Sequence, residues 1–214
     1  MNKQNLIKTI NKSNSINLIN IIKQVCEGFH NHTHILYDIA TLLDKKITYL
    51  EIGAYHGSSA ALMASHPSVE KVVSIDTGII FTPEEVIDNV KQFKHKECKY
   101  SYLQGNSDSK EVLKIVNEKF AKIDILFIDA DHSYNAVIAD YNNYKHLVSS
   151  GGVIVFDDYR DSEYSPQVRP AVDFLAEKKF AADGFKVIGS LVYDTLSLTN
   201  HPIDSSNEFI ITNL

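Results

Sequence analysis

Short apolar runs rich in β-branched residues alternate along this chain with longer segments in which apolar residues recur at helical period. The apolar runs fall at 47–53, 71–76, 99–105, 123–130 and 151–158, and the helical patterns between them cover about 58–66, 83–94, 107–119 and 134–148. Strands separated by helices are typical of parallel sheets, because a parallel crossover needs about a dozen residues or more. The pattern therefore predicts a doubly wound α/β fold, with helices on both faces of a mostly parallel sheet.

The two ends of the chain follow other patterns. Residues 1–46 are mostly helical in pattern, and a further helix is expected at 167–182. Two β-rich stretches, 185–200 and 207–214, are then joined by the turn-like residues HPIDSS. This closing pair predicts antiparallel strands beside five parallel ones, which gives a seven-stranded sheet. We expect a single domain, 1–214, made of an N-terminal helical lid or cap (1–46) and an α/β core (47–214).

The composition and charge of the chain limit the kinds of partner and the cellular location that we expect. Hydrophobic residues make up 44% of the chain and charged residues 22%, and no apolar run is long enough for a membrane helix, so a soluble protein is expected. The formal charge is -6 and the basic residues are scattered, which argues against nucleic acid. The polar N-terminus resembles neither a signal peptide nor a transit peptide, which favours the cytoplasm. Cys26 and Cys98 form no paired motif and are interpreted as reduced thiols.

The stretch YLEIGAYHGSSAAL, residues 49–62, runs from an apolar strand through two glycines into helix-forming residues. In open parallel sheets this first turn is a favoured ligand site, although many such turns carry glycine only to pack helix on strand. The pattern here is E-x-G-x-x-x-G, from Glu51 through Gly53 to Gly57, and Tyr55 stands where a dinucleotide pyrophosphate needs bare backbone. Asp76, which ends the second apolar run, is placed to accept both hydroxyls of a ribose, or else it is a solvated acid at a strand end. A ribose without a pyrophosphate indicates S-adenosylmethionine.

Three further acids suggest a metal site. Asp129 and Asp157 end two apolar runs that are 28 residues apart, a βαβ spacing that places them on adjacent parallel strands roughly 4.8 Å apart. Converging carboxylates repel each other unless a proton or a cation intervenes, and oxygen ligands suit Mg²⁺, Mn²⁺ or Ca²⁺. We predict that Asp129, Asp157 and Asp158 hold such a cation, with Mg²⁺ as the first choice. The alternative is that these acids only terminate strands at the solvated sheet edge.

These motifs carry a family resemblance. The stretch YLEIGAYHGSSAALMA is similar to the first motif of class I S-adenosylmethionine-dependent methyltransferases, and especially to the small metal-dependent O-methyltransferases of the catechol and caffeoyl-CoA type. The stretch ILFIDADHSYNAVIADYNNYKHLVSSGGVIVFDDY resembles the fourth and fifth strand region of the same group and of the macrocin-type sugar O-methyltransferases. Matching order and spacing cover roughly residues 47–175. The resemblance implies a Rossmann-like methyltransferase fold.

The resemblance also implies roles for residues at matching positions. Glu51 and the backbone of Gly53 would face the methionine part of the cofactor, and the Ser59 hydroxyl would meet its carboxylate. Gly105 and Ser107 match positions that border the adenine, although a helix N-cap explains Ser107 equally well. The complete set of expected cofactor contacts is Glu51, Gly53, Tyr55, Gly57, Ser59, Asp76, Gly105, Ser107 and Asp129.

The catalytic pair implied by the resemblance is His132 with Asp129. His132 stands where the catechol and caffeoyl-CoA groups have a catalytic lysine, and an imidazole is a suitable general base near neutral pH. A cap of the helix expected from Tyr134 is the other interpretation of His132. Asp158 also departs from the family, because the catechol group has Asn at that position.

The function expected from these residues is transfer of a methyl group, assisted by a divalent cation, to a small hydroxylated acceptor such as a catechol or a sugar diol. The alternatives are a metal-independent transfer with His132 as base and a noncatalytic S-adenosylmethionine-binding protein. Asp129-Ala130-Asp131 also resembles the D-x-D of metal-dependent phosphotransferases, which leaves the glycine turn without a purpose. The expected partner is a small-molecule acceptor, without nucleic acid or membrane, and a homodimer is left open.

Two other segments hold chemically suggestive residues. The histidines at 30, 32 and 34 alternate in HNHTH, but their surroundings look helical and we interpret them as surface or lid histidines. Tyr159, Arg160 and Arg169 follow the fifth parallel strand, where loops shape the acceptor pocket, and they are candidates for substrate contact or solvated loop residues.

Overall fold

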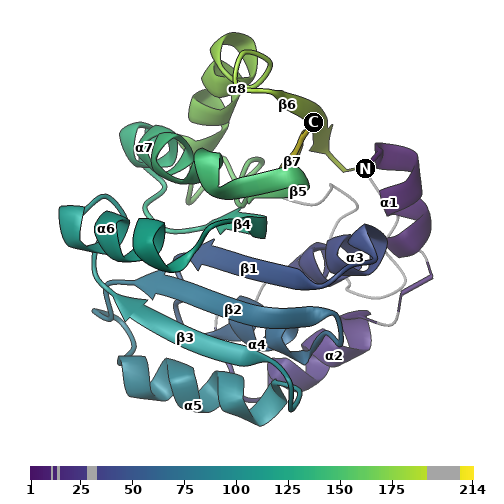
Figure 1. Ribbon diagram of the computed structural model, residues 1–214, viewed down its shortest axis with the longest axis vertical. Helices are drawn as coiled ribbons and strands as arrows, with labels where there is room; N and C mark the ends of the chain where they lie inside the picture. The colour runs from purple at the N-terminus through teal and green to yellow at the C-terminus, as the bar shows by residue number, and fades with distance from the viewer. Residues whose placement is uncertain (11, 14, 28–32, 192–207) are drawn as a thin grey trace.

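The computed structural model describes residues 1–10, 12–13, 15–27, 33–191 and 208–214. Its strands form one seven-stranded sheet in the order β3-β2-β1-β4-β5-β7-β6 (Figure 1). The strands are β1 (Ile47–Ile52), β2 (Val69–Asp76), β3 (Lys99–Gln104), β4 (Ile123–Ile128), β5 (Val148–Phe156), β6 (Phe185–Ser190) and β7 (Phe209–Asn213). The first five are parallel, and β7 pairs antiparallel with both β5 and β6. The predicted fold class is confirmed.

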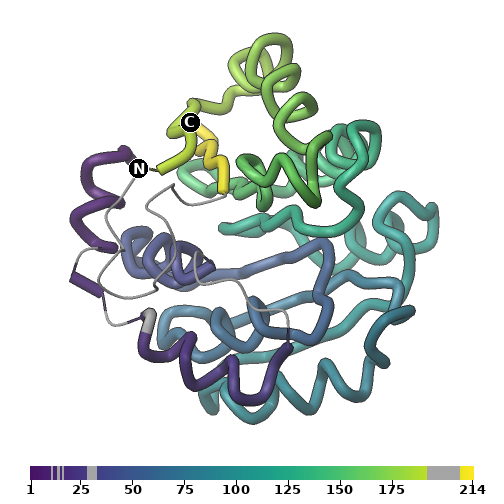
Figure 2. Tube along the Cα trace, turned by 180° about the vertical axis from the view of Figure 1, so that it is seen from behind, coloured from purple at the N-terminus to yellow at the C-terminus, as the bar shows by residue number. Residues whose placement is uncertain are grey.

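Helices cover both faces of this sheet, as expected. Apolar residues of the N-terminal helices and of α4 and α5 share one core with the sheet, whereas those of α6, α7 and α8 share a second core on the other face. Figure 2 shows the molecule from behind. The helices are α1 (Lys3–Ile10), α2 (Ser15–Ile22), α3 (His34–Leu43), α4 (Ser58–Ser65), α5 (Pro83–Phe93), α6 (Lys110–Lys119), α7 (Tyr134–Tyr144) and α8 (Val168–Lys178), with a short 3₁₀ turn at Lys145–Leu147.

Some element boundaries differ from those expected. Helix α6 begins at Lys110 and not at residue 107, because the Ser109 side chain caps it by accepting from the Val112 amide. Strand β5 begins at Val148, three residues before the expected run, and its register against β4 shifts between Ile123 and Ile125. The glycines at 151–152 lie in this irregular part of the strand and do not precede it. Residues 192–207 of the expected closing hairpin, and its turn, lie outside the described residues.

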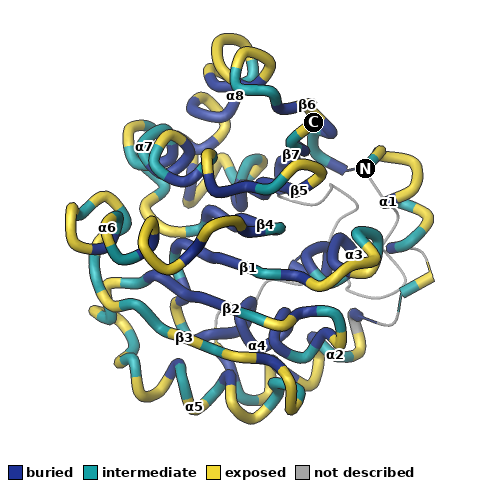
Figure 3. The backbone as a smooth tube through the Cα atoms, in the orientation of Figure 1, coloured by how far each residue is buried: buried dark blue, intermediate teal, exposed yellow. Residues whose placement is uncertain are grey.

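The buried residues concentrate in the central strands, while the outer faces of the helices are exposed (Figure 3). Helix α1 contributes Leu6 and Ile10 to the core, and the Lys3 ammonium donates to the Ser190 carbonyl at the end of β6, 2.8 Å away. The N-terminal helices therefore pack as part of the same body, and their role as a lid, like a homodimer and a cytoplasmic location, remains a prediction. Within the part of the chain that is described, no helix has the length and apolar content needed to cross a membrane.

The register of the parallel strands places the expected site residues at one edge. Ile52 of β1 pairs with Ile128 of β4, and Ile128 pairs with Phe156 of β5. The residues that follow these three are Gly53, Asp129 and Asp157, so they leave the sheet at the same level. Because parallel strands end on one side, the acids after β2, β4 and β5 meet at the carboxyl edge.

Candidate active site

The turn after β1 depends on Gly53. Its amide donates to the Ile75 carbonyl at 2.8 Å, and its φ of 90° lies in the region that favours glycine. A Cβ atom at this position would lie 1.8 Å from the carbonyl oxygen of Asp129. Gly53 is therefore the residue that lets the β1 turn pass directly over the end of β4.

The same turn leads into α4 through two more residues with positive φ. Gly57 is the N-cap of α4, and its amide donates to the Ala54 carbonyl at 2.7 Å. A Cβ atom there would meet Val86 of α5 at 3.1 Å, so this glycine serves helix packing. Tyr55 has φ 46° and is 44% exposed. Its ring packs edge-on against the Phe81 ring, with 4.8 Å between the ring centroids.

Glu51 is fully buried and is bound by three hydroxyl groups. It accepts from Tyr49 at 2.9 Å, from Ser59 at 2.7 Å and from Ser74 at 2.6 Å. Burial raises the pKa of Glu51 to about 7, against the opposing effect of these hydrogen bonds. The Ser59 hydroxyl therefore donates to Glu51 in this structure, and its predicted contact with a ligand carboxylate stays a prediction.

Asp76 ends β2 and fastens it to two neighbouring turns. One carboxylate oxygen accepts from the amides of Ala54 and Tyr55 at 2.8 and 3.2 Å, and the other accepts from the Gly78 amide at 2.7 Å. The Tyr102 hydroxyl also donates to this second oxygen, at 3.4 Å, so each of the roughly four acceptor positions of the carboxylate has a protein donor. The Gly105 amide donates to the Asp76 carbonyl at 2.9 Å, which brings the end of β3 to the same place.

Ser107 is not a helix cap, because Ser109 has that role. The Ser107 hydroxyl donates to Asp140 of α7 at 2.6 Å, and its carbonyl accepts from the Tyr144 hydroxyl at 2.6 Å. Asp140 is only 2% exposed, and burial raises its pKa to about 6. The sequence analysis missed Asp140, because one acid in the middle of a helix gave no signal that it faces the site.

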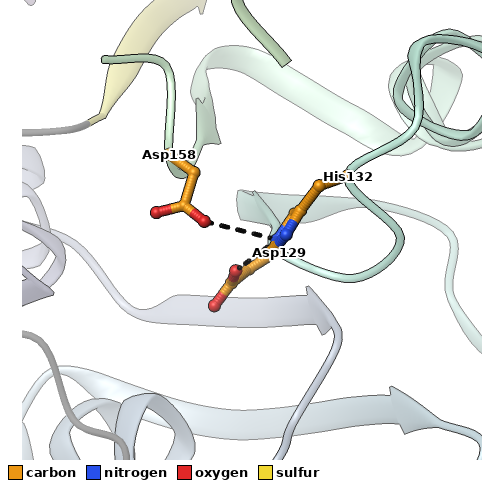
Figure 4. Close-up of side chains that lie close together, drawn as sticks. All are labelled: Asp129, His132 and Asp158. Carbon is orange, nitrogen blue, oxygen red and sulfur yellow. Dashed lines mark hydrogen bonds and ion pairs between the residues drawn. The ribbon is translucent and has the colours of Figure 1, made fainter. Parts of the chain in front are cut away.

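Three side chains meet at the ends of β4 and β5 (Figure 4). The Nε2 atom of His132 lies 3.4 Å from Oδ1 of Asp129 and 3.5 Å from Oδ2 of Asp158, and one ligand atom from each residue lies within 4.8 Å of the others. This group contains two members of the predicted metal set, with His132 in place of Asp157. Consecutive residues leaving a strand point in different directions, and Asp158 turns the chain with φ 54°. Asp157 is buried beside the group.

Ser165, which the sequence analysis also missed, joins two of these side chains. Its hydroxyl lies 2.7 Å from Oδ2 of Asp158 and 3.0 Å from Nδ1 of His132, and the residue is 1% exposed. A carboxylate only accepts, so the hydroxyl donates to Asp158 and its oxygen accepts from the Nδ1–H of His132. This fixes the tautomer in which Nε2 faces the two carboxylates. His132 is therefore not the cap of α7, whose N-cap is Ser133.

The charges in this group shift each other's titration. Burial raises the pKa of Asp129 well above its usual range, and the neighbouring Asp157 charge raises it further. The hydrogen bond to Asp129 raises the pKa of His132, against the effect of burial. The group thus contains three carboxyl groups, those of Asp129, Asp157 and Asp158, and one side chain that can carry a positive charge, His132.

A cavity of about 770 Å³ connects these parts. The expected site residues that line it are Gly53, Tyr55, Ser59, Asp76, Gly105, Ser107, Asp129, His132, Asp157 and Asp158, whereas Glu51 and Gly57 lie outside its lining. Glu51 is hydrogen-bonded to Ser59, which does line the cavity, and its expected contact with the cofactor stays a prediction. Tyr159, Arg160 and Arg169 also lie outside the lining.

Of the three alternating histidines, 30 and 32 lie outside the described residues. The His34 side chain is buried, with Nδ1 3.0 Å from the Asp38 carboxylate, so the surface interpretation of His34 is wrong.

Known proteins similar to this chain were found by sequence and by structure. The family described as a methyltransferase domain matches residues 50–159. The uncharacterised protein R132 of Acanthamoeba polyphaga mimivirus is 37% identical over 192 residues, which cover 86% of this chain and 87% of that protein. Because it covers 86% of this chain, the similarity to R132 extends beyond residues 50–159 on both sides.

Two solved structures show the extent of the likeness in fold. An O-methyltransferase from Bacillus cereus in complex with SAH is 17% identical, with a TM-score of 0.62 over 93% of this chain and 90% of that one. MycE methyltransferase from the mycinamycin biosynthetic pathway, in complex with Mg and SAH, is 16% identical, with a TM-score of 0.55 over 81% of this chain and 47% of that one. From the family match together with the sheet order, we conclude that the chain belongs to the methyltransferase domain family and is a class I S-adenosylmethionine-dependent methyltransferase.

Proposed function

We propose that this enzyme is an O-methyltransferase that uses a divalent cation and acts on a small hydroxylated acceptor, such as a catechol or a sugar diol. The observation that carries the proposal is the position of His132. Its Nε2 atom lies within 3.5 Å of the carboxylates of Asp129 and Asp158, in the same cavity as Asp76 and Ser107. A base and a set of oxygen ligands thus face the space beside the cofactor residues.

The cofactor half of the cavity lies between β1, β2 and β3. S-adenosylmethionine supplies, when bound, an electrophilic methyl group on a positively charged sulfur. Asp76 would hold the ribose, whose hydroxyl group would take the acceptor position of the long 3.4 Å bond from Tyr102, and Gly105 and Ser107 would border the adenine. The bare backbone at Gly53 and the hydroxyl of Ser59 would face the methionine part, with Glu51 fixing the Ser59 rotamer through a 2.7 Å hydrogen bond.

The acids at the ends of β4 and β5 fit a hard divalent cation. Asp129 and Asp158 offer oxygen atoms close to one another, and Asp157 lies beside them. Burial raises the pKa of Asp129, and the Asp157 charge raises it further, so a cation bound there would favour the charged carboxylate. Mg²⁺ is the first choice, with Mn²⁺ and Ca²⁺ as alternatives. Asp129, Asp157 and Asp158 would hold such a cation, which would supply orientation of the acceptor oxygens and a lowered pKa of the acceptor hydroxyl. The MycE structure, which holds Mg and SAH, supports this assignment.

His132 is the proposed general base. The Ser165 hydroxyl keeps the proton of His132 on Nδ1, so Nε2 is the nitrogen that accepts the acceptor's hydroxyl proton. Asp129, 3.4 Å from Nε2, stabilises the imidazolium that results. An acceptor oxygen that has given its proton to Nε2 would be the nucleophile for the methyl group that the cofactor supplies.

A metal-independent transfer with His132 as base is the second candidate, and the Ser165 contact with His132 favours it as well. A phosphotransferase is disfavoured, because phosphate groups are usually held by Lys or Arg, and none of the described residues that line the cavity is either. A noncatalytic cofactor-binding protein would have no need of a base held in one tautomer.

Calorimetry with S-adenosylmethionine, with and without Mg²⁺, tests the proposal together with S-adenosylhomocysteine formation across catechol and sugar acceptors. The wild type is expected to bind both cofactor and cation, and Asp129→Ala is expected to lose the cation. The control, Asp88→Asn, changes an exposed acid that pairs with Lys91 on α5 and should behave as wild type. Turnover without any bound cation would favour the metal-independent route, and cofactor binding without turnover of any acceptor would reject O-methyl transfer.

A further inference from the structure

The cavity is lined by acids almost to the exclusion of bases. Seven carboxylates line it, and His132 is the one basic side chain among the described residues that do so. The acids are Asp76, Asp108, Asp129, Asp131, Asp140, Asp157 and Asp158. Asp108 and Asp131 are exposed, so the negative charge extends to the part of the cavity that solvent reaches. Charge of one sign in a cleft attracts the opposite charge and repels its own.

None of the described residues that line this cavity is a Lys or an Arg. The residues outside the described ranges, 11, 14, 28–32 and 192–207, contain neither residue type. The arginines of the loop and helix after β5 are held elsewhere, since Arg160 donates to Ser190 at 2.9 Å and Arg169 pairs with Asp173 at 3.6 Å. An acceptor with a carboxylate or a phosphate would therefore lack a cationic side chain to pair with.

We propose that the natural acceptor carries a positively charged amine near its hydroxyl group, and that anionic acceptors are selected against. The inference rests on the proposed O-methyl transfer and specifies its substrate class. A bound divalent cation, the sulfonium and a protonated His132 would together still be outnumbered by the seven carboxylates. The remaining negative field favours entry of a cation, and it disfavours acceptors that are coenzyme A thioesters, because coenzyme A carries phosphate groups.

Two series of acceptors that differ mainly in charge test this. The catechol series is dopamine, catechol and protocatechuate, and the sugar series is glucosamine, glucose and glucuronate, each running from cation through neutral molecule to anion. In the series that is turned over, kcat/KM is expected to fall in that order, with at least about a tenfold difference between cation and anion. The difference should shrink between about 0.01 M and about 1 M salt, because the Debye length falls from roughly 30 Å to roughly 3 Å.

A pair of variants separates the cavity field from the charge of the whole protein. Asp108→Asn combined with Asp131→Asn removes two lining charges outside the proposed metal set and should reduce the cation-to-anion ratio at least about twofold. Asp161→Asn is the matched control for Asp131→Asn. Both acids accept from a backbone amide two residues later, at 2.8 Å for Asp131 and 2.9 Å for Asp161, but Asp161 does not line the cavity. This control should leave the ratio at the wild-type value.

An anion turned over as well as its matched cation would overturn the inference and leave O-methyl transfer standing. Where neither series is turned over, the dissociation constants of the same acceptors from enzyme loaded with S-adenosylhomocysteine and Mg²⁺ are compared. Equal affinities for cation and anion would then refute the charge selection. A complete lack of methyl transfer to either series and to wider acceptor panels counts against the proposed function itself, whatever the order of the affinities.

Discussion

An added Cβ atom on Gly53 would lie 1.8 Å from the carbonyl oxygen of Asp129. Real Cβ contacts are never this short, and the clashing atom belongs to the backbone, so the β1 turn and the end of β4 would have to separate. The close approach of the β1 turn to the end of β4 is therefore possible only because residue 53 has no side chain.

Gly53→Ala is expected to destabilise the protein by at least about 3 kcal/mol, which is in the range of severe single substitutions. The matched control is Gly151→Ala, which has a similar φ of 74° but nothing within 4 Å of the added Cβ. The control should lose only the cost of the backbone conformation, about 1 to 2 kcal/mol. Urea unfolding of both variants measures the difference, and equal losses would show that the clash is relieved at no cost.

Because the pKa of Glu51 is raised by folding, we expect the stability of the protein to depend on pH. Its pKa is about 7 in the folded protein against 4.5 ordinarily, so the folded state binds more protons than the unfolded state between these values. Stability from this group is fully present below about pH 4.5 and is lost as pH rises through about 7, by about 3 kcal/mol at most. Glu51→Gln removes the titrating group and should flatten this part of the profile, measured as unfolding free energy from pH 5 to pH 8 in steps of about one unit. An unchanged slope in Glu51→Gln would assign the effect to other groups.

Replacing Ser165 is expected to impair cation binding or catalysis, which replacing a merely structural serine would not do. Ser165→Ala removes the bond to Asp158 and the acceptor for Nδ1 of His132, so cation affinity or kcat should fall about 10- to 100-fold, as for other groups that orient metal ligands. Ser165→Thr keeps a hydroxyl and should recover most of the loss. Ser65→Ala is the control, because the Ser65 hydroxyl donates only to the Leu62 carbonyl on α4. Equal activity in Ser165→Ala and wild type would remove Ser165 from the mechanism.

Replacing Asp140 is expected to weaken the binding of the cofactor. Asp140→Ala leaves the Ser107 hydroxyl without its 2.6 Å partner, and S-adenosylmethionine affinity should fall about three- to tenfold, the equivalent of one hydrogen bond of about 1 kcal/mol. Asp140→Asn retains an acceptor oxygen and should lose less. Calorimetric titration distinguishes the two variants, and wild-type affinity in both would indicate that cofactor binding does not depend on the bond between Asp140 and Ser107.

Sequence patterns predicted the parts of this site that follow from local order. Asp129 and Asp157 each come directly after an apolar run, and parallel strands end on the same side, so their approach required no knowledge of tertiary contacts. Gly53 was recognised as a turn glycine, although the reason that it must be glycine, the carbonyl of Asp129, comes from a strand 76 residues later. Ser107 was ambiguous because Ser109 carries the same capping signal two residues away.

The contacts that were missed join residues brought together only by folding. Ser165 meets His132 and Ser107 meets Asp140 across 33 residues of sequence in each case, and neither pair has a spacing that a local pattern reports. The family resemblance implies a cofactor contact for Glu51. A strand residue faces one side of the sheet or the other, however, and the helix packed on that side covers Glu51.

The sequence by itself determined the order of strands and helices, the parallel sheet and the edge at which its acids gather, because hydrophobic period and strand direction are local properties of the chain. Only the tertiary structure decided that His132 lies between Asp129 and Asp158, that Glu51 is sealed beneath Ser59, and that the cavity is lined by seven carboxylates. These depend on side-chain directions and on packing between distant segments, which a single sequence does not specify.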